Sequence, residues 1–128
     1  MKNKLSDNGQ RIDYGKSAAM REPAEGKGRP GLISPWALTR LAKHYENGCK
    51  KYDDYNWRKG MPFSRYTDSM FRHLIAWMQK DESEDHLAAI AWNAFAVMHH
   101  QELGEDVKWD DMPNKDLEVK CEKLNLPM

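Results

Sequence analysis

The sequence predicts an all-α protein, a bundle of three to five helices. Apolar residues recur every three or four positions in several segments, which is the spacing of one helix face. No segment alternates β-branched or aromatic residues with polar ones as a strand does, and no internal repeat is present. A chain of 128 residues is the size of a single domain with one core.

The first 33 residues are expected to form an extended arm, because their glycines and prolines interrupt any helix. Basic residues are spread along the same segment: Arg11, Lys16, Arg21, Lys27 and Arg29. A glycine-rich basic segment can bind a phosphate through backbone amides and side chains together. A disordered tail is the alternative interpretation.

A first helix is expected to begin at Ser34, with this serine as N-cap and Pro35 at the first helical position. The residues that recur at helical spacing predict a buried face that runs to about Tyr52: Leu38, Leu41, Tyr45, Cys49 and Tyr52. Residues 53–62 lose this period and end in glycine and proline, so a structured loop is expected there.

Ser64 is the expected N-cap of a second helix that ends near Lys80. An acidic connection follows over residues 81–85, in which Ser83 is expected to cap a third helix that Gly104 ends. This third helix is apolar around most of its circumference, which is typical of a helix buried in a bundle or a subunit interface. Assembly into a homodimer or homotetramer is therefore expected to complete the core.

Three parts are expected: an extended basic arm (residues 1–33), a helical core (residues 34–104) and a peripheral C-terminal tail (residues 105–128). Residues 116–124 are a candidate short helix within that tail. The first residues have no apolar signal core, and no run of eighteen uncharged apolar residues occurs. The expected location is the cytoplasm, or the host cytoplasm for a phage-encoded protein.

Charge and cysteine content exclude several function classes. Twenty basic and twenty acidic residues balance to a net charge of zero, which argues against direct binding to duplex nucleic acid or to an anionic membrane. A small, locally charged ligand remains compatible. The two cysteines, Cys49 and Cys121, have no metal-binding or redox spacing and are expected to be reduced thiols.

A polar stripe crosses the apolar third helix. His86, Asn93 and His100 recur every seven residues and therefore share one side of the helix, with the small residue Ala89 between the first two. Small residues beside polar ones can form the floor of a ligand groove. The competing interpretation is that Asn93 and His86 only hydrogen-bond a neighbouring helix or cap a loop.

Carboxylates on the other helices have two interpretations. Asp68 and Arg72 are four residues apart, so they can form a surface ion pair, or serve as a metal ligand and a phosphate contact. His73 is expected to point elsewhere, towards Tyr66 and Trp77.

One carboxylate comes from each of three helices or helix starts: Glu46, Asp68 and Asp85. Hard oxygen ligands of this kind suit Mg²⁺ or Mn²⁺, and such ions suit a polyphosphate substrate. No Walker-type glycine-rich loop, GxSxG elbow or HExxH motif is present, which excludes the commonest hydrolase templates.

A series of short motifs occurs in a fixed order between about residues 15 and 98. They are Met20-Arg21-Glu22-Pro23, Gly26-Lys27-Gly28-Arg29, Leu32-Ile33-Ser34-Pro35, the segment from Tyr45 to Tyr52, Asn56-Trp57, the segment from Gly60 to Tyr66, Arg72-His73-Leu74, His86-Leu87-Ala88 and Trp92-Asn93-Ala94. In this combination the chain resembles the phage-type dATP/dGTP diphosphohydrolases. These are relatives of the MazG-like all-α nucleoside triphosphate pyrophosphohydrolases.

The resemblance implies a MazG-like bundle and an enzyme that hydrolyses dGTP, dATP or both to the monophosphate and pyrophosphate, with Mg²⁺ or Mn²⁺ as cofactor. It implies catalytic roles for Glu46, Asp68 and Lys50, and metal binding by Glu46, Asp68, Asp85 and His86. The implied substrate contacts are Arg21, Lys27, Arg29, Lys51, Asn56, Trp57, Arg72, His73 and Asn93. Among these, Trp57 would stack on the purine base and Asn56 would hydrogen-bond its edge.

The chain departs from the broader MazG-like group at the metal motifs. That group carries ExxE on one helix and ExxD on the next, and neither occurs here at the expected places. His86 and Ala89 stand in the ExxD position, and Asp68 and Arg72 stand near the ExxE position. Two other functions stay open, a non-catalytic nucleotide-binding regulator and a helical structural adaptor.

Overall fold

The computed structural model describes residues 9–16, 18–113 and 123–125. These residues form two short 3-10 helices, η1 (Pro30–Leu32) and η2 (Asn56–Lys59), and four α-helices: α1 (Pro35–Cys49), α2 (Phe63–Met78), α3 (His86–Glu102) and α4 (Asp106–Trp109). No strand occurs in the described part of the chain, where an isolated bridge joins Ile12 to Arg21. The all-α prediction is confirmed.

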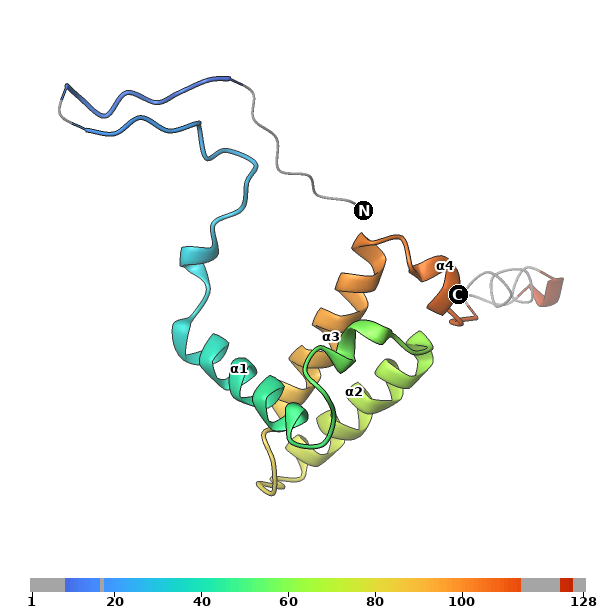
Figure 1. Cartoon of the computed structure of the whole chain (residues 1–128). Helices are drawn as coiled ribbons and strands as arrows, with labels where there is room; N and C mark the ends of the chain where they lie inside the picture. The colour runs from blue at the N-terminus through green and yellow to red at the C-terminus, as the bar shows by residue number, and fades with distance from the viewer. Residues whose placement is uncertain (1–8, 17, 114–122, 126–128) are drawn as a thin grey trace.

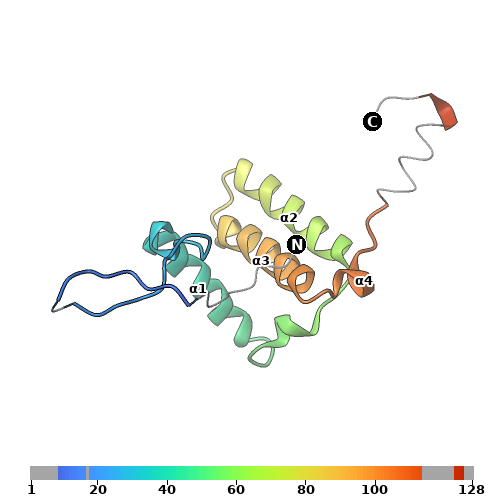
Figure 2. The ribbon, with the colours of Figure 1, turned by 90° about the horizontal axis from the view of Figure 1, so that it is seen from above.

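Helix α3 is the central element of the bundle. It packs against α2 along most of its length and against α1 on another side, so that it lies between them when seen from above (Figure 2). The arm before α1 extends away from the helices (Figure 1). Because α3 contacts both other long helices, its side chains are the ones best placed to join groups from all three.

Helix α1 begins where the sequence predicts but ends earlier. The Ser34 hydroxyl accepts a hydrogen bond from the Ala37 amide at 3.2 Å, as an N-cap does. The helix ends at Cys49, three residues before Tyr52, and of the predicted buried face only Leu41 is buried. Tyr45 is half-buried, whereas Leu38, Cys49 and Tyr52 are exposed, because α1 packs on α3 along a narrow strip.

Both later N-cap predictions were wrong. Ser64 is the second residue of α2, and its amide and hydroxyl donate to Asp111 at 2.8 Å and 2.5 Å. Ser83 donates its hydroxyl to Asp81, and the true cap of α3 is Asp85, which accepts from the Ala88 amide at 3.1 Å. The Ser64 amide takes its partner from the distant Asp111, which local sequence does not predict, whereas the cap of α3 is a local contact two residues beyond the expected serine.

The core lies between α2 and α3. Phe63, Tyr66 and Ala96 form its buried centre, and the partly buried Trp92, Val97 and Trp109 pack against it. Trp109 comes from α4, in the segment that was expected to be peripheral. Most of the candidate helix over residues 116–124 lies outside the described residues.

Large apolar side chains stay exposed on the outer face of α2. Phe71 is 60 % exposed, Ile75 is 54 % and Met78 is 65 %, and they follow one another at helical spacing. Among the described residues, no helix combines the length and the apolar character needed to cross a membrane.

Candidate functional site

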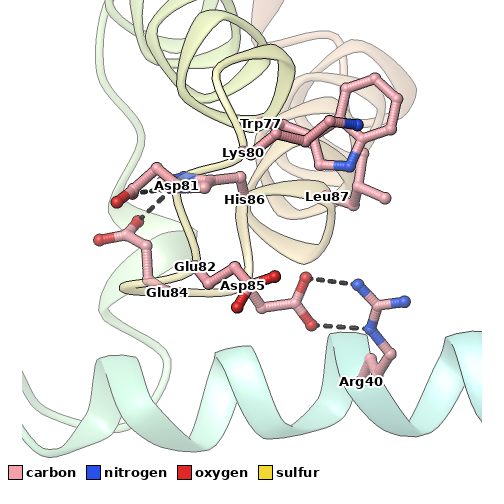
Figure 3. A pocket seen from close by; sticks show the side chains of 9 residues that line it. All are labelled: Arg40, Trp77, Lys80, Asp81, Glu82, Glu84, Asp85, His86 and Leu87. Atoms are coloured by element: carbon pink, nitrogen blue, oxygen red, sulfur yellow. Dashed lines mark hydrogen bonds and ion pairs between the residues drawn. The ribbon is translucent and has the colours of Figure 1, made fainter.

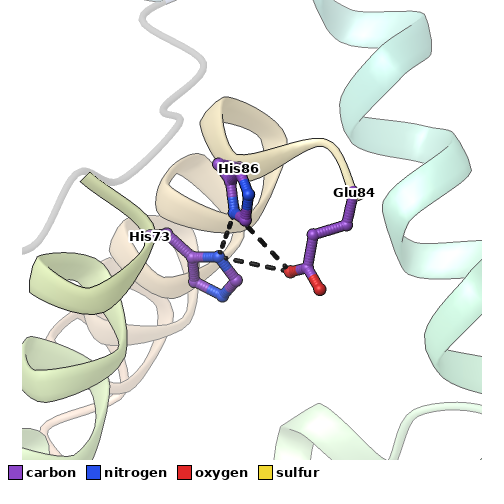
Figure 4. A group of neighbouring side chains, drawn as sticks. All are labelled: His73, Glu84 and His86. Atoms are coloured by element: carbon purple, nitrogen blue, oxygen red, sulfur yellow. Dashed lines mark hydrogen bonds and ion pairs between the residues drawn. The ribbon is translucent and has the colours of Figure 1, made fainter. Parts of the chain in front are cut away.

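Three potential metal ligands converge where α2 ends and α3 begins (Figure 4). His73 Nδ1 lies 2.9 Å from His86 Nδ1 and 3.2 Å from Glu84 Oε1, and His86 Nδ1 lies 3.8 Å from the same carboxylate oxygen. Two imidazole nitrogens and one carboxylate oxygen at these separations can ligate a single divalent ion.

A carboxylate fixes the protonation of His86. Asp81 Oδ2 lies 2.5 Å from His86 Nε2, and the Ser83 hydroxyl donates to the same oxygen at 2.6 Å. The hydrogen bonds from Ser83 and His86 hold the pKa of Asp81 below its usual value, so it is an ionised acceptor at neutral pH. This contact favours the tautomer of His86 with a proton on Nε2, in which the Nδ1 lone pair of the ring faces His73 and Glu84.

The turn between the helices places these ligands. Lys80 has a left-handed φ of 64°, and the Asp81 amide donates to the Ala76 carbonyl at 3.0 Å. This is the hydrogen-bond pattern that closes a helix C-terminus when the following residue is left-handed, a position usually held by glycine. The chain therefore reverses sharply and carries residues 81–86 back beside the end of α2.

An ion pair ties this turn to α1 (Figure 3). Arg40 donates from Nε and Nη2 to the two carboxylate oxygens of Asp85 at 2.8 Å and 2.7 Å. The hydrogen bond from Arg40 is the main cause that lowers the pKa of Asp85 to about 2, with the Ala88 amide assisting. Asp85 thus joins α1 to the N-terminus of α3, and its oxygens are committed to these contacts.

His44 on α1 is a third imidazole of this region. Its pKa is lowered, chiefly by burial and further by the nearby His73, so it is neutral at neutral pH. Its ring contacts Trp92 edge-on at 6.3 Å between centroids. We call His73, Glu84 and His86 the ligand group. His44 therefore adds no positive charge beside it.

A cleft of about 490 Å³ opens beside the ligand group (Figure 3). Its lining residues are Arg40, Trp77, Lys80, Asp81, Glu82, Glu84, Asp85, His86 and Leu87. Glu84 and His86 belong both to the cleft wall and to the ligand group, so an ion held there would be reachable from solvent. We call this the acidic cleft, because four carboxylates line it.

A second cleft of about 510 Å³ lies where α1 ends and η2 begins. Its lining residues are Cys49, Lys50, Lys51, Tyr52, Asp53, Asn56 and Lys59. We call it the lysine cleft, because three lysines face one carboxylate there and favour an anionic ligand. Arg40 lies on α1 and Lys50 directly follows its last residue, ten positions later, so the two clefts are about 15 Å apart along the helix.

The structure joins the predicted site residues only in part. His73 and His86 meet, and Lys50, Lys51 and Asn56 share the lysine cleft. The three predicted carboxylates, Glu46, Asp68 and Asp85, do not belong to either group of potential metal ligands found among the described residues. Of the predicted metal set, His86 alone is in such a group.

Two other predicted residues have structural partners. The Asn93 amide donates to the Ser69 hydroxyl at 3.2 Å and to the Ala89 carbonyl at 2.8 Å. This buried residue therefore hydrogen-bonds a neighbouring helix, as the competing interpretation of the polar stripe predicts. Trp57 is half-buried and packs edge-on against Tyr45 and His99.

The remaining predicted substrate contacts are exposed. Arg72 lies on the solvent side of α2, and three lie on the arm: Arg21, Lys27 and Arg29. Lys27 pairs with Glu22 of the same arm at 2.7 Å. The arm extends away from the helices (Figure 1).

Sequence reasoning missed Glu84, Asp81 and Arg40 as site residues. It also did not pair His73 with His86, which meet because the acidic turn brings the start of α3 against the end of α2. The run of acidic residues beside a histidine was the available signal for Glu84 and Asp81. Arg40 had no local signal, since its partner is 45 residues away.

Comparison with known proteins identifies the family. The family model described as dATP/dGTP diphosphohydrolase, N-terminal, matches residues 17–110. No curated protein and no solved structure matches the chain. The match covers well over half of the 128 residues and includes the ligand group and both clefts. The chain therefore belongs to the dATP/dGTP diphosphohydrolase family, whose N-terminal domain it contains.

Proposed function

We propose that this protein hydrolyses purine deoxynucleoside triphosphates, dGTP, dATP or both, to the monophosphate and pyrophosphate. The observation that carries the proposal is the convergence of His73, Glu84 and His86 beside an open cleft in a member of this family. In the reaction, the oxygen of water bonds to the α-phosphorus and the bond to the bridging oxygen breaks. Pyrophosphate leaves with that oxygen, and the proton of the attacking water passes to solvent.

The ligand group fits a first-row transition ion better than Mg²⁺. Imidazole nitrogens suit Zn²⁺ and iron, carboxylates suit Mn²⁺, and Mg²⁺ prefers oxygen ligands alone. Of the two ions expected from the resemblance, Mn²⁺ is thus the better match. When bound, such an ion would polarise the α-phosphate and lower the pKa of a water molecule.

The protein's own groups would orient and hold the reacting partners. Asp81 keeps the lone pair of His86 Nδ1 aimed at the ion position, and the Arg40–Asp85 ion pair fixes the turn that carries Glu84. Lys80 and Arg40 are the cations of the acidic cleft and would contact phosphate oxygens there.

The lysine cleft is proposed to bind the phosphates furthest from the reacting bond, through Lys50 and Lys51. The structure supports this through its excess of positive charge. Because about 15 Å separate the clefts along α1, this role needs its own test. The double variant K50A/K51A should raise KM about tenfold or more with kcat little changed, as expected when binding is lost equally in substrate and transition state.

A homodimer or homotetramer is part of the proposal. The support is the exposed apolar stripe on α2 and the small buried core of the described residues. The proposed substrates are intracellular nucleotides, so we also propose that the enzyme acts in the cytoplasm.

The decisive experiment incubates the purified chain with each dNTP and Mg²⁺, Mn²⁺ or Zn²⁺ in turn, and resolves the products. Deoxynucleoside monophosphate with pyrophosphate, formed fastest from dGTP or dATP, supports the proposal. Diphosphate with phosphate would contradict it. Nucleotide binding without turnover would indicate a regulator, and neither binding nor turnover would indicate a structural adaptor.

A further inference from the structure

A second group of potential metal ligands lies at the opposite end of α3. It comprises His99, His100 and Glu105, whose nearest ligand atoms all lie within 4.8 Å of one another. His86 and His100 are fourteen residues apart on one helix, so about 21 Å separate the two groups. The second group is therefore independent of the ion position in the acidic cleft.

His100 is the most unusual member of this group. It is 0 % exposed, and neither of its ring nitrogens has a hydrogen-bond partner among the described residues. Glu105 Oε2 is 3.5 Å from its Nδ1, close enough for attraction but without hydrogen-bond geometry. Buried imidazoles are nearly always partnered, so this ring presents an unused lone pair inside the protein.

The other buried polar atoms without a partner are gathered around the same ring. In the described part of the chain they are the Trp109 indole nitrogen and the Tyr66 hydroxyl, which the Met61 backbone approaches. Tyr66 lies 6.4 Å from His100 between ring centroids, and Trp109 and His100 both border Gly60. The unsatisfied polarity is thus concentrated around His100. Because an indole N–H only donates, a cation at this place would take the imidazole and not Trp109 as a ligand.

The backbone places Glu105 beside His100. Gly104 has a φ of 72°, its amide donates to the Gln101 carbonyl at 3.0 Å, and the Glu105 amide donates to the His100 carbonyl at 2.8 Å. This left-handed ending of α3 folds the chain back over the last helical turn. Glu105 is therefore held beside His100 whether or not its side chain gains a ligand.

His99 is the third member of the group. Its half-buried ring lies 5.1 Å from the His100 ring and 4.9 Å from Trp57, both edge-on. The tryptophan belongs to η2, which also supplies Asn56 and Lys59 to the lysine cleft. A ligand at this group would therefore contact the same residues that hold η2 in place.

We propose that His99, His100 and Glu105 bind a structural Zn²⁺ ion. Two imidazoles and one carboxylate are ordinary zinc ligands, and they are poor ligands for Mg²⁺. The negative end of the α3 dipole also favours a cation there. The ion stabilises the junction of α3, α4 and η2, and through η2 it stabilises the lysine cleft.

The test uses the full chain with the first ligand group disabled by the substitutions H73Q and E84Q. After removal of metal with EDTA, Zn²⁺ is titrated in competition with a chromophoric chelator, and the melting temperature is measured with and without Zn²⁺. This background should bind one equivalent of Zn²⁺, and the ion should raise its melting temperature. Adding E105Q or H99Q should weaken binding by more than about 100-fold, since loss of an outer-shell partner alone costs roughly 10–100-fold.

His44→Gln in the same background is the matched control, because this half-buried histidine belongs to neither group; it should leave Zn²⁺ affinity unchanged. His100→Gln risks misfolding, so the decision rests on the partly exposed Glu105 and His99. The inference is overturned if the background binds no Zn²⁺, or if E105Q and H99Q both bind it as tightly as the background does. Either result leaves the nucleotide hydrolysis of the wild-type chain untouched, so the two proposals fail separately.

Discussion

His86 shows how one side chain acquires its role from a neighbour. The imidazole is 6 % exposed and has Asp81 on one nitrogen and the ligand group on the other. The carboxylate selects the tautomer, and the tautomer determines which lone pair is available to a metal. The acidic cleft is thus organised by a residue that does not itself belong to the ligand group.

Asp81→Asn tests this arrangement. The neutral amide holds the His86 proton less strongly, so the affinity for Mn²⁺ should fall by roughly 10–100-fold and the rate of dNTP hydrolysis should fall with it. Isothermal titration with Mn²⁺ and a pyrophosphate-release assay measure the two effects. Glu82→Gln, an exposed neighbour in the same turn, is the control and should change neither quantity. Unchanged metal affinity in the Asp81 variant would remove Asp81 from this role.

Asp85 makes a pH-dependent contribution to stability. Its pKa of about 2 in the folded protein lies below the unfolded value of roughly 3.9. The unfolded chain therefore binds the proton more tightly, so the contribution is complete above about pH 4 and is lost as the pH falls towards 2. Asparagine removes the charge but keeps the helix cap.

Urea unfolding at pH 6 and pH 3 separates these effects. The wild type should lose more stability between the two pH values than Asp85→Asn does, because only the wild type loses the ion pair with Arg40. Asp85→Ala should be less stable than Asp85→Asn at pH 6 by about 1 kcal/mol, the usual effect of losing an N-cap. An identical pH dependence in wild type and Asp85→Asn would show that the ion pair contributes nothing.

At the scale of elements, two glycines differ in whether their surroundings leave room for a side chain. Gly48 lies near the end of α1, and an added Cβ there would meet no atom within 4 Å. Gly60 follows η2 with a φ of 81°, and an added Cβ would contact Trp109 Nε1 and lie 2.8 Å from its Cε2. The indole of α4 thus packs directly on the backbone of the loop that leads into α2.

Gly60→Ala should destabilise the fold by at least about 2 kcal/mol, since the left-handed backbone and the indole both oppose a side chain. Gly48→Ala should stabilise it by about 0.5–1 kcal/mol, as alanine does inside a helix. Chemical denaturation of both variants measures the difference. A Gly60→Ala variant as stable as the wild type would contradict the packing of Trp109 on Gly60, with Gly48→Ala as the unobstructed control.

At the scale of the whole molecule, the three long helices leave apolar surface uncovered. The outer stripe of α2 contains Phe71, Ile75 and Met78, all more than half exposed. Exposed apolar surface that is continuous along a helix usually marks a binding surface. This surface is the proposed contact between copies of the chain.

Ile75→Glu should therefore convert the proposed dimer or tetramer to a monomer, because a charge would be buried at the contact. Light scattering after size-exclusion chromatography gives the mass of each species. Val107→Glu is the matched control, since this residue is 92 % exposed on α4 and lies off the stripe. A wild-type chain that is monomeric at tens of micromolar would contradict the proposal.

The sequence predicted the helices better than the site. Hydrophobic period and the Ser34-Pro35 pair located α1, and the seven-residue spacing placed His86, Asn93 and His100 on one buried side of α3. The site was recovered only where its residues lie close together in the sequence, as in the lysine cleft, which is lined by residues between Cys49 and Lys59. The ligand group was not, because it joins α2, the acidic turn and α3.

The sequence by itself determined the helical class, the family motifs and the buried polar side of α3. Only the tertiary structure decided that His73 faces His86, that Arg40 holds Asp85 and that Glu105 lies beside His100. The physical reason is that helical periodicity determines which side of its own helix a residue occupies. Which residue it faces depends on how tightly each turn reverses the chain and on how the helices pack. No local sequence pattern determines the turn geometry or the packing.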